Sequence, residues 1–148
     1  ERFMKNSAEV GIDGIIIADV PYEEKEEFNS VSSRYGIDFI SLIAPTSCGR
    51  IGMIAKEAEG FVYCVSSLGV RSKITTDISK MVKSVKEAKD IPCAVGFGIS
   101  TPEQAAEMAK YADGVIVGSA IVNKCAEYGE NCISHIYDYV KSMKSVLK

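Results

Sequence analysis

The sequence predicts an α/β fold in which parallel strands alternate with helices. Short apolar runs recur along the chain, and each is followed by a stretch with helical periodicity. Several of these runs, such as Gly14 to Asp19 (GIIIAD), are apolar on both faces, which is typical of strands covered on both sides. A repeated strand–helix order implies right-handed crossovers, and these place successive strands side by side and parallel.

Five strands are expected, at residues 14–19, 38–43, 61–66, 92–96 and 113–117. Helices are expected at residues 3–10, 23–35, 47–59, 77–90, from 101 onward, 119–128 and 132–147, with a loop at 67–76. Gly36 suits the left-handed position that ends a helix. Thr101, Pro102 and Gln104 form the pattern of a capped helix start, and Asp77 is expected to cap another.

The chain of 148 residues is expected to be a single domain, because no linker or low-complexity tract divides it. Two architectures fit: an open doubly wound sheet, or about the last five βα units of a (β/α)8 TIM barrel. A complete barrel typically needs about 250 residues. Part of a barrel has open sheet edges, and the chain opens at Glu1 within a helical pattern. We therefore expect the missing units to lie elsewhere.

Composition excludes several classes of function. A net charge of −3 argues against nucleic-acid or membrane-surface binding, and no apolar run approaches a membrane span. The five cysteines are odd in number and lack CxxC spacing, which argues against a disulfide framework and a zinc site and favours a cytoplasmic setting. His135 is the only histidine and is not expected to act chemically. The run Glu23 to Glu27 is expected to be a solvated helix face, and Cys64, Cys93 and Met53 to fill the core.

Two glycine-bearing turns follow the last two expected strands: Gly96-Phe97-Gly98 and Gly118-Ser119. Functional groups in parallel α/β folds gather at the carboxyl ends of strands. Glycine lets backbone N–H groups approach an anion, and a helix that starts at Ser119 adds unpaired N–H groups. The pair predicts a site for a phosphate monoester. The alternative is that both are merely tight turns between strand and helix.

Several stretches together resemble the tryptophan synthase alpha subunit. They are Asp19-Val20-Pro21, Ala44-Pro45-Thr46-Ser47, Gly60-Phe61-Val62-Tyr63, Ser66-Ser67-Leu68-Gly69-Val70, Gly96 to Glu103 and Ala112 to Val122. The resemblance implies a (β/α)8 barrel that cleaves indole-3-glycerol phosphate to indole and glyceraldehyde 3-phosphate. It implies no cofactor or metal of its own and a pyridoxal-phosphate beta subunit as partner. The sequence departs from the family where Val70 meets Arg71, because the family continues there with Thr-Gly and a mobile loop.

The resemblance also implies roles for individual residues. Gly98, Gly118 and Ser119 would hold the substrate phosphate, and Phe97 and Ile116 would line the indole pocket. Tyr63 would reach the site near the catalytic acid, although a tyrosine in the core of a strand is an equal alternative. Asp19 would lie on the mouth loop facing the beta subunit.

The two catalytic acids of the family come from its second strand and the loop after it, so no catalytic residue is expected in this stretch. Alone it should bind phosphate poorly and catalyse nothing. Two other functions stay open: another phosphate-sugar barrel enzyme, such as an isomerase or epimerase, and a non-catalytic half-barrel.

Overall fold

The computed structural model of the chain describes residues 1–47, 49–65, 71–96 and 98–147, with backbone alone for residues 71–76. Its helices and strands are, in order, α1 (Arg2–Glu9), β1 (Gly14–Ile15), α2 (Lys25–Ser32), β2 (Asp38–Phe39), β3 (Ser41–Ile43), α3 (Ile51–Glu57), β4 (Val62–Val65), α4 (Arg71–Ala88), β5 (Cys93–Gly96), α5 (Pro102–Met108), β6 (Gly114–Ile116), α6 (Ser119–Tyr128) and α7 (Cys132–Ser145). Short 3-10 turns lie at Tyr22–Glu24, Ser33–Tyr35, Pro45–Ser47 and Gly129–Asn131.

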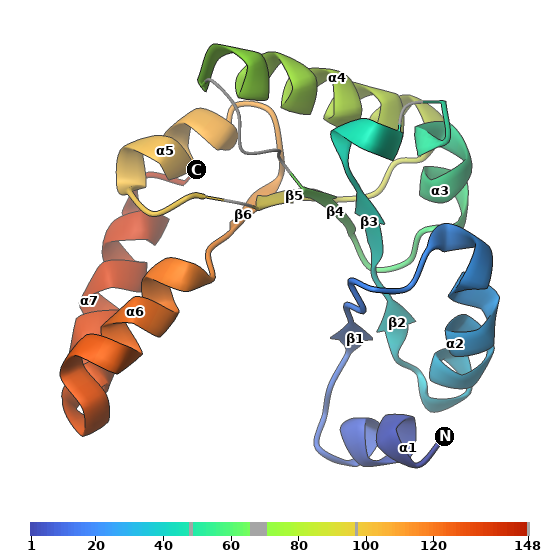
Figure 1. The fold of residues 1–148 in the computed structure, drawn as a ribbon, viewed down its shortest axis with the longest axis horizontal. Coiled ribbons are helices and arrows are strands. Elements are labelled where there is room, and N and C mark those ends of the chain that lie inside the picture. The colour runs from blue at the N-terminus through green and yellow to red at the C-terminus, as the bar shows by residue number, and fades with distance from the viewer. Residues whose placement is uncertain (48, 66–70, 97, 148) are drawn as a thin grey trace.

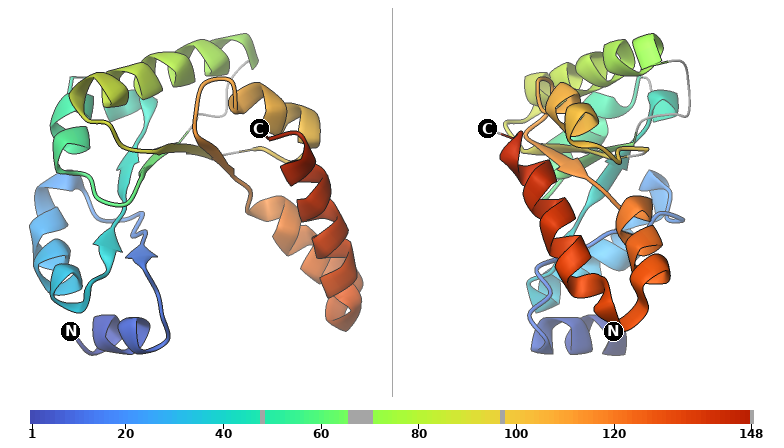
Figure 2. Two further views of the ribbon diagram at one scale, coloured as in Figure 1. Left: turned by 180° about the vertical axis from the view of Figure 1, so that it is seen from behind. Right: turned by 90° about the vertical axis from the view of Figure 1, so that its left-hand side faces the viewer.

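These elements form an open arch (Figure 1). Strands β3 to β6 lie along its middle, and α3, α4 and α5 cover the outer side. The pair α6 and α7 forms one leg of the arch, and α1 and α2 form the other (Figures 1 and 2). Every strand pair is parallel, as the sequence predicted.

The sheet is divided in two at Ile40. Strand β2 pairs with β1, whereas β3 begins a four-stranded sheet in the order β3-β4-β5-β6. The single strand expected at residues 38–43 is therefore split, because the chain changes partner: Asp38 is opposite Gly14, and Ser41 is opposite Val62. The strand expected at residues 14–19 was also too long, since β1 ends at Ile15.

The register of the four-stranded sheet separates two faces. Ile43, Cys64 and Val95 are fully buried on the side of the outer helices and belong to one hydrophobic core with α3 and α4. Leu42 and Tyr63, on the opposite side, are only half-buried. Within this stretch the inner face of the sheet is therefore less buried than the outer face. Cys64 and Cys93 fill the core as predicted.

Two helix boundaries test the capping predictions. The Thr101 hydroxyl accepts a hydrogen bond from the Gln104 N–H at 3.3 Å, and the Gln104 side chain accepts one from the Thr101 N–H at 3.1 Å, so the predicted capping box is confirmed. Asp77 was wrongly expected to begin a helix, because α4 already starts at Arg71. No glycine or proline interrupts residues 71–88, so residues 71–76 of the expected loop join the helix, whereas residues 67–70 lie outside the described part of the chain.

Two side chains lie where the sequence did not place them. Met53 was expected in the core and is 47% exposed. Lys25 was expected on a solvated face and is 7% exposed. Its ammonium donates to the Glu57 carbonyl oxygen at 3.1 Å and lies 3.4 Å from the Glu57 carboxylate, so burial is compensated by charge pairing. A hydrogen bond from Tyr22, followed by that from Lys25, lowers the pKa of Glu57.

A salt bridge and a hydrogen bond, both to Asp113, connect α4, β5 and the start of β6 at the amino ends of the last two strands. The Asp113 carboxylate accepts a hydrogen bond from the Cys93 N–H at 2.7 Å and pairs with the Lys86 ammonium at 2.9 Å. The Lys86 bond, and then the Cys93 bond, lower the pKa of Asp113. In barrel folds this end of the strands contributes stability rather than chemistry.

Replacing Asp113 with Asn is expected to lower the free energy of unfolding at pH 7 by about 1 kcal/mol, the size expected for a partly exposed pair. The folded-state pKa of Asp113 lies below that of the unfolded chain. The stabilisation is therefore present above about pH 3.9 and is lost as the pH falls through the lowered pKa. Urea unfolding of the parent protein and of Asp113→Asn, repeated as the pH is lowered, measures the difference in their free energies of unfolding. A difference that persists unchanged at about pH 2, below the unfolded-state value, would show that the charge is not responsible.

Candidate functional site

A cleft opens at the carboxyl ends of β4, β5 and β6. Its volume is about 490 Å³, which lies within the range of small-molecule sites, about 300–1,000 Å³. The residues that line it are Tyr63, Gly98, Ile99, Ser100, Ile116, Gly118, Ser119, Ala120 and Asn123. The structure thus brings together both glycine turns, Tyr63 and Ile116, all of which the sequence analysis assigned to one site.

The turn at Gly118 and Ser119 presents a helix start to this cleft. Gly118 is the N-terminal cap residue of α6, and both residues are exposed. A side-chain carbon built on Gly118 meets no atom within 4 Å, so the space above the turn is open. The first N–H groups of a helix have no partner within the helix and carry its positive dipole end. The turn therefore offers donors to an anion.

The turn at Gly98 faces the same cleft. Gly98 has φ +70°, a left-handed conformation that favours glycine, and open space surrounds the position of its missing side chain. The next residues are held firmly. The Ser100 N–H donates to the Gln104 side chain at 2.8 Å, and the Tyr139 hydroxyl donates to the Ser100 carbonyl at 2.9 Å. Helices α5 and α7 thereby fix the turn that would meet the ligand.

Tyr63 projects from β4 onto the inner face and lies against Gly96 of β5. A side-chain carbon on Gly96 would lie 2.5 Å from the Tyr63 hydroxyl oxygen and 2.6 Å from its ring. Glycine at this position therefore makes room for the ring. Tyr63 is half-buried and lines the cleft, whereas the strand residues of the buried core face the outer helices.

The remaining predicted residues lie away from the cleft or outside the described part of the chain. Asp19 is exposed in the loop after β1 and is not among the residues that line the cleft. Phe97 and the motif at residues 66–70 lie outside the described residues. Asn123 was missed. It lies one helical turn after Ser119, and this spacing places it on the same face of α6.

The lining of the cleft contains no charged side chain among its nine described residues. Among these nine residues, the donors for an anion include backbone N–H groups and the hydroxyls of Ser119 and Tyr63. Among the residues that the structure describes, no cluster of three or more His, Cys, Asp and Glu side chains is placed to hold a metal ion. None of the helices so described is both long and apolar enough to cross a membrane.

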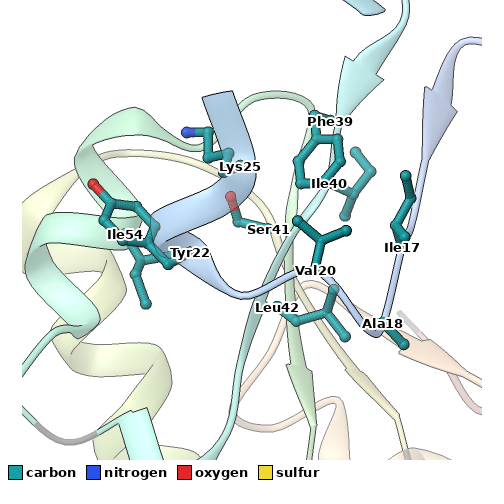
Figure 3. A pocket seen from close by; sticks show the side chains of 10 residues that line it. All are labelled: Ile17, Ala18, Val20, Tyr22, Lys25, Phe39, Ile40, Ser41, Leu42 and Ile54. Atoms are coloured by element: carbon teal, nitrogen blue, oxygen red, sulfur yellow. The ribbon is translucent and has the colours of Figure 1, made fainter. Parts of the chain in front are cut away.

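A small cavity, of about 60 Å³, lies between the segment at residues 17–25 and residues 39–42 of the β2–β3 segment, and Ile54 of α3 also lines it (Figure 3). It is far below the size of a ligand site. Ser41 is 5% exposed and lines this cavity. Its hydroxyl oxygen is buried and makes no hydrogen bond with the described residues.

Replacing Ser41 with Ala is expected to leave the free energy of unfolding unchanged or to raise it by up to about 1 kcal/mol, because an unpaired buried hydroxyl is costly. Denaturant unfolding of the variant beside the parent protein provides the measurement. Ser47, whose hydroxyl accepts a hydrogen bond from the Ala44 N–H at 3.2 Å, supplies the matched control. Its replacement by Ala is expected to destabilise. Equal losses in the two variants would contradict the expectation for Ser41.

Parallel strands with helices on the outer side, and a cleft at the carboxyl ends of the strands, define part of a (β/α)8 barrel. The profile of one family, described as tryptophan synthase alpha chain, matches residues 1–148. The chain belongs to the tryptophan synthase alpha chain family.

Individual relatives agree with this assignment. The tryptophan synthase alpha chain of Thermoanaerobacter pseudethanolicus (strain ATCC 33223 / 39E) is 47% identical over 151 residues, covering 100% of this chain and 57% of that protein. Tryptophan synthase subunit alpha from Campylobacter jejuni has a similar structure, with a TM-score of 0.86 at 31% identity over 96% of this chain and 58% of that one. A chain of the Pyrococcus furiosus tryptophan synthase a2b2 complex has a TM-score of 0.82 at 29% identity, and the match covers 97% of this chain and 59% of that one. This chain therefore spans a little over half the length of these relatives.

Proposed function

We propose that the protein containing this chain is a lyase that cleaves indole-3-glycerol phosphate to indole and glyceraldehyde 3-phosphate in tryptophan biosynthesis. The observation that carries the proposal is that one cleft is lined by Gly98, Gly118, Ser119, Tyr63 and Ile116, in a chain of this family. The family match does not favour a phosphate-sugar isomerase or epimerase.

This chain would supply the substrate-binding part of the site. Open donors at Gly98, Gly118 and Ser119 would hold the phosphate, because charge-assisted hydrogen bonds contribute about 1.5–3 kcal/mol each. Ile116, with Phe97, would form an apolar wall for the indole ring. Tyr63, whose ring occupies the space that Gly96 leaves open, would border the reacting end of the substrate.

The reaction is a retro-aldol cleavage. One acid protonates the indole carbon that bears the side chain, a base removes the proton from the adjacent hydroxyl group, and the carbon–carbon bond breaks. Carboxylates suit both roles when their surroundings tune their pKa values. By the family resemblance, these two acids come from strand and loop positions that this sequence does not match. We assign neither role to Asp19, which stays a residue of the mouth loop.

The resemblance and the name of the Pyrococcus complex support a second part of the proposal, assembly with a beta subunit as a heterotetramer. The alpha-type protein would need no cofactor, since pyridoxal phosphate belongs to the beta subunit. Asp19, exposed after β1, would face that partner. We propose a cytoplasmic location for the assembly.

An indole-release assay tests the proposed function. The complete protein is incubated with indole-3-glycerol phosphate, with and without a beta subunit, and indole is quantified by chromatography. We expect indole with the complete protein and faster release with the beta subunit. The 148-residue stretch alone is expected to release none. Interconversion of a sugar phosphate without indole release from the complete protein would overturn the proposal.

A further inference from the structure

The loop end of the α6–α7 hairpin carries two cysteines that the proposed function does not use. Cys125 lies in α6, Cys132 is the first residue of α7, and the turn Gly129–Asn131 reverses the chain between them. Both are free thiols; Cys125 is exposed and Cys132 is partly exposed. The two helices lie side by side in both figures, and this turn is at the opposite end of α6 from Ser119 (Figures 1 and 2).

Ring stacking shows which faces of the two helices meet. Tyr128 and His135 stack with their ring centroids 3.7 Å apart and their planes 13° from parallel. Cys125 lies three residues before Tyr128 in α6, and Cys132 lies three residues before His135 in α7. Residues three apart share a face of a helix. The two thiols therefore lie on the same facing surfaces as the stacked rings.

The thiols also interact with each other. The pKa of Cys125 is raised, first by desolvation and then by the charge of Cys132 and a hydrogen bond with it. The two residues lie on different helices, and the short turn Gly129–Asn131 connects these helices.

We propose that Cys125 and Cys132 form a disulfide by exchange with a small-molecule disulfide such as oxidised glutathione. The Cys132 thiolate attacks one sulfur of the small molecule, forms a mixed disulfide and releases one thiol. Cys125 then loses its proton and attacks the Cys132 sulfur, which releases the second thiol. Two protein thiols are oxidised to one disulfide, and one small-molecule disulfide is reduced to two thiols.

The chain provides an internal comparison. Cys64 and Cys93 also contact each other through a hydrogen bond, which together with burial raises the pKa of Cys64. They are 0% and 1% exposed, so a dissolved disulfide cannot reach them in the folded protein. Oxidation of the folded chain is therefore expected at the hairpin pair and not at the core pair.

The experiment follows oxidation by mass. The complete protein, carrying Cys48→Ser so that this thiol does not contribute, is reduced and then exposed to oxidised glutathione. We expect the mass to fall by two hydrogen atoms, and a peptide linking Cys125 to Cys132 after digestion. Cys125→Ser should instead retain one glutathione, bound at Cys132, because the second exchange step is lost.

Two results would overturn the proposal. One is retention of glutathione at Cys125 or Cys132 in the parent protein without a linked peptide. That result would show that the disulfide between Cys125 and Cys132 does not form. The other is linkage of Cys64 to Cys93 at the same rate, since that shows oxidation of unfolded chains.

Discussion

Gly118→Asp is expected to reduce kcat/KM for indole-3-glycerol phosphate by about 100-fold or more while leaving the fold intact. A carboxylate would occupy the open space above the turn and repel the substrate phosphate. Losing two charge-assisted hydrogen bonds at about 1.5–3 kcal/mol each accounts for this magnitude. The fold should persist, because φ of Gly118 is −114° and a side-chain carbon there meets no atom within 4 Å.

Gly118→Asn is the matched control, because Asn has the shape of Asp without its charge. We expect a smaller reduction of kcat/KM for Gly118→Asn than for Gly118→Asp. For Ser119→Ala, which removes one hydroxyl donor, we expect a reduction of about tenfold. Steady-state kinetics of the three variants, beside thermal unfolding, separate binding from stability. Equal activity of the Asp and Asn variants would refute an anion at this turn.

Gly96→Ala is expected to displace the Tyr63 ring from the cleft and to lower both activity and stability. The added methyl group would lie 2.5 Å from the Tyr63 hydroxyl oxygen. Overpacking of this kind typically costs about 1–3 kcal/mol. Adding Tyr63→Ala should relieve the collision, so the double variant is expected to be more stable than the two single losses summed predict.

Gly114→Ala provides the control for this pair. Gly114 lies on the neighbouring strand β6, and a side-chain carbon there would contact only the Ala94 methyl group at 3.9 Å. We expect little change from it in either activity or unfolding. A double-mutant cycle in urea, repeated in the lyase assay, measures the coupling. Strict additivity of the Gly96 and Tyr63 changes would show that the two residues do not compete for space.

Much of this fold follows from local sequence signals. The Thr101 capping box and the left-handed Gly36 depend on neighbouring residues alone, and both were predicted. The sequence did not predict the break at Ile40 or the buried Lys25. The first depends on which strands become partners, and the second on Glu57, which lies 32 residues further along the chain.

The candidate site was predictable for a different reason. In parallel folds the carboxyl ends of the strands converge, so turns that are distant in sequence can be assigned to one edge from the order of strands and helices alone. Gly98, Gly118 and Ser119 followed this rule. Asn123 did not, because nothing in its neighbourhood distinguishes it from other polar residues of a helix surface. The roles of all these residues in substrate binding stay predictions.

The division of the sheet at Ile40 has a consequence for how the molecule opens. Ile37, Phe39 and Met4 are buried around β1 and β2, but they do not belong to the large core cluster that β3 to β6 form with α3 and α4. Buried residues that do not belong to the main core cluster favour an opening event separate from that of the cluster. We therefore expect the backbone amides of α1, β1, α2 and β2 to exchange with deuterium well before those of Val62 and Val95. Ile40 should mark the boundary between the fast-exchanging and the slow-exchanging amides.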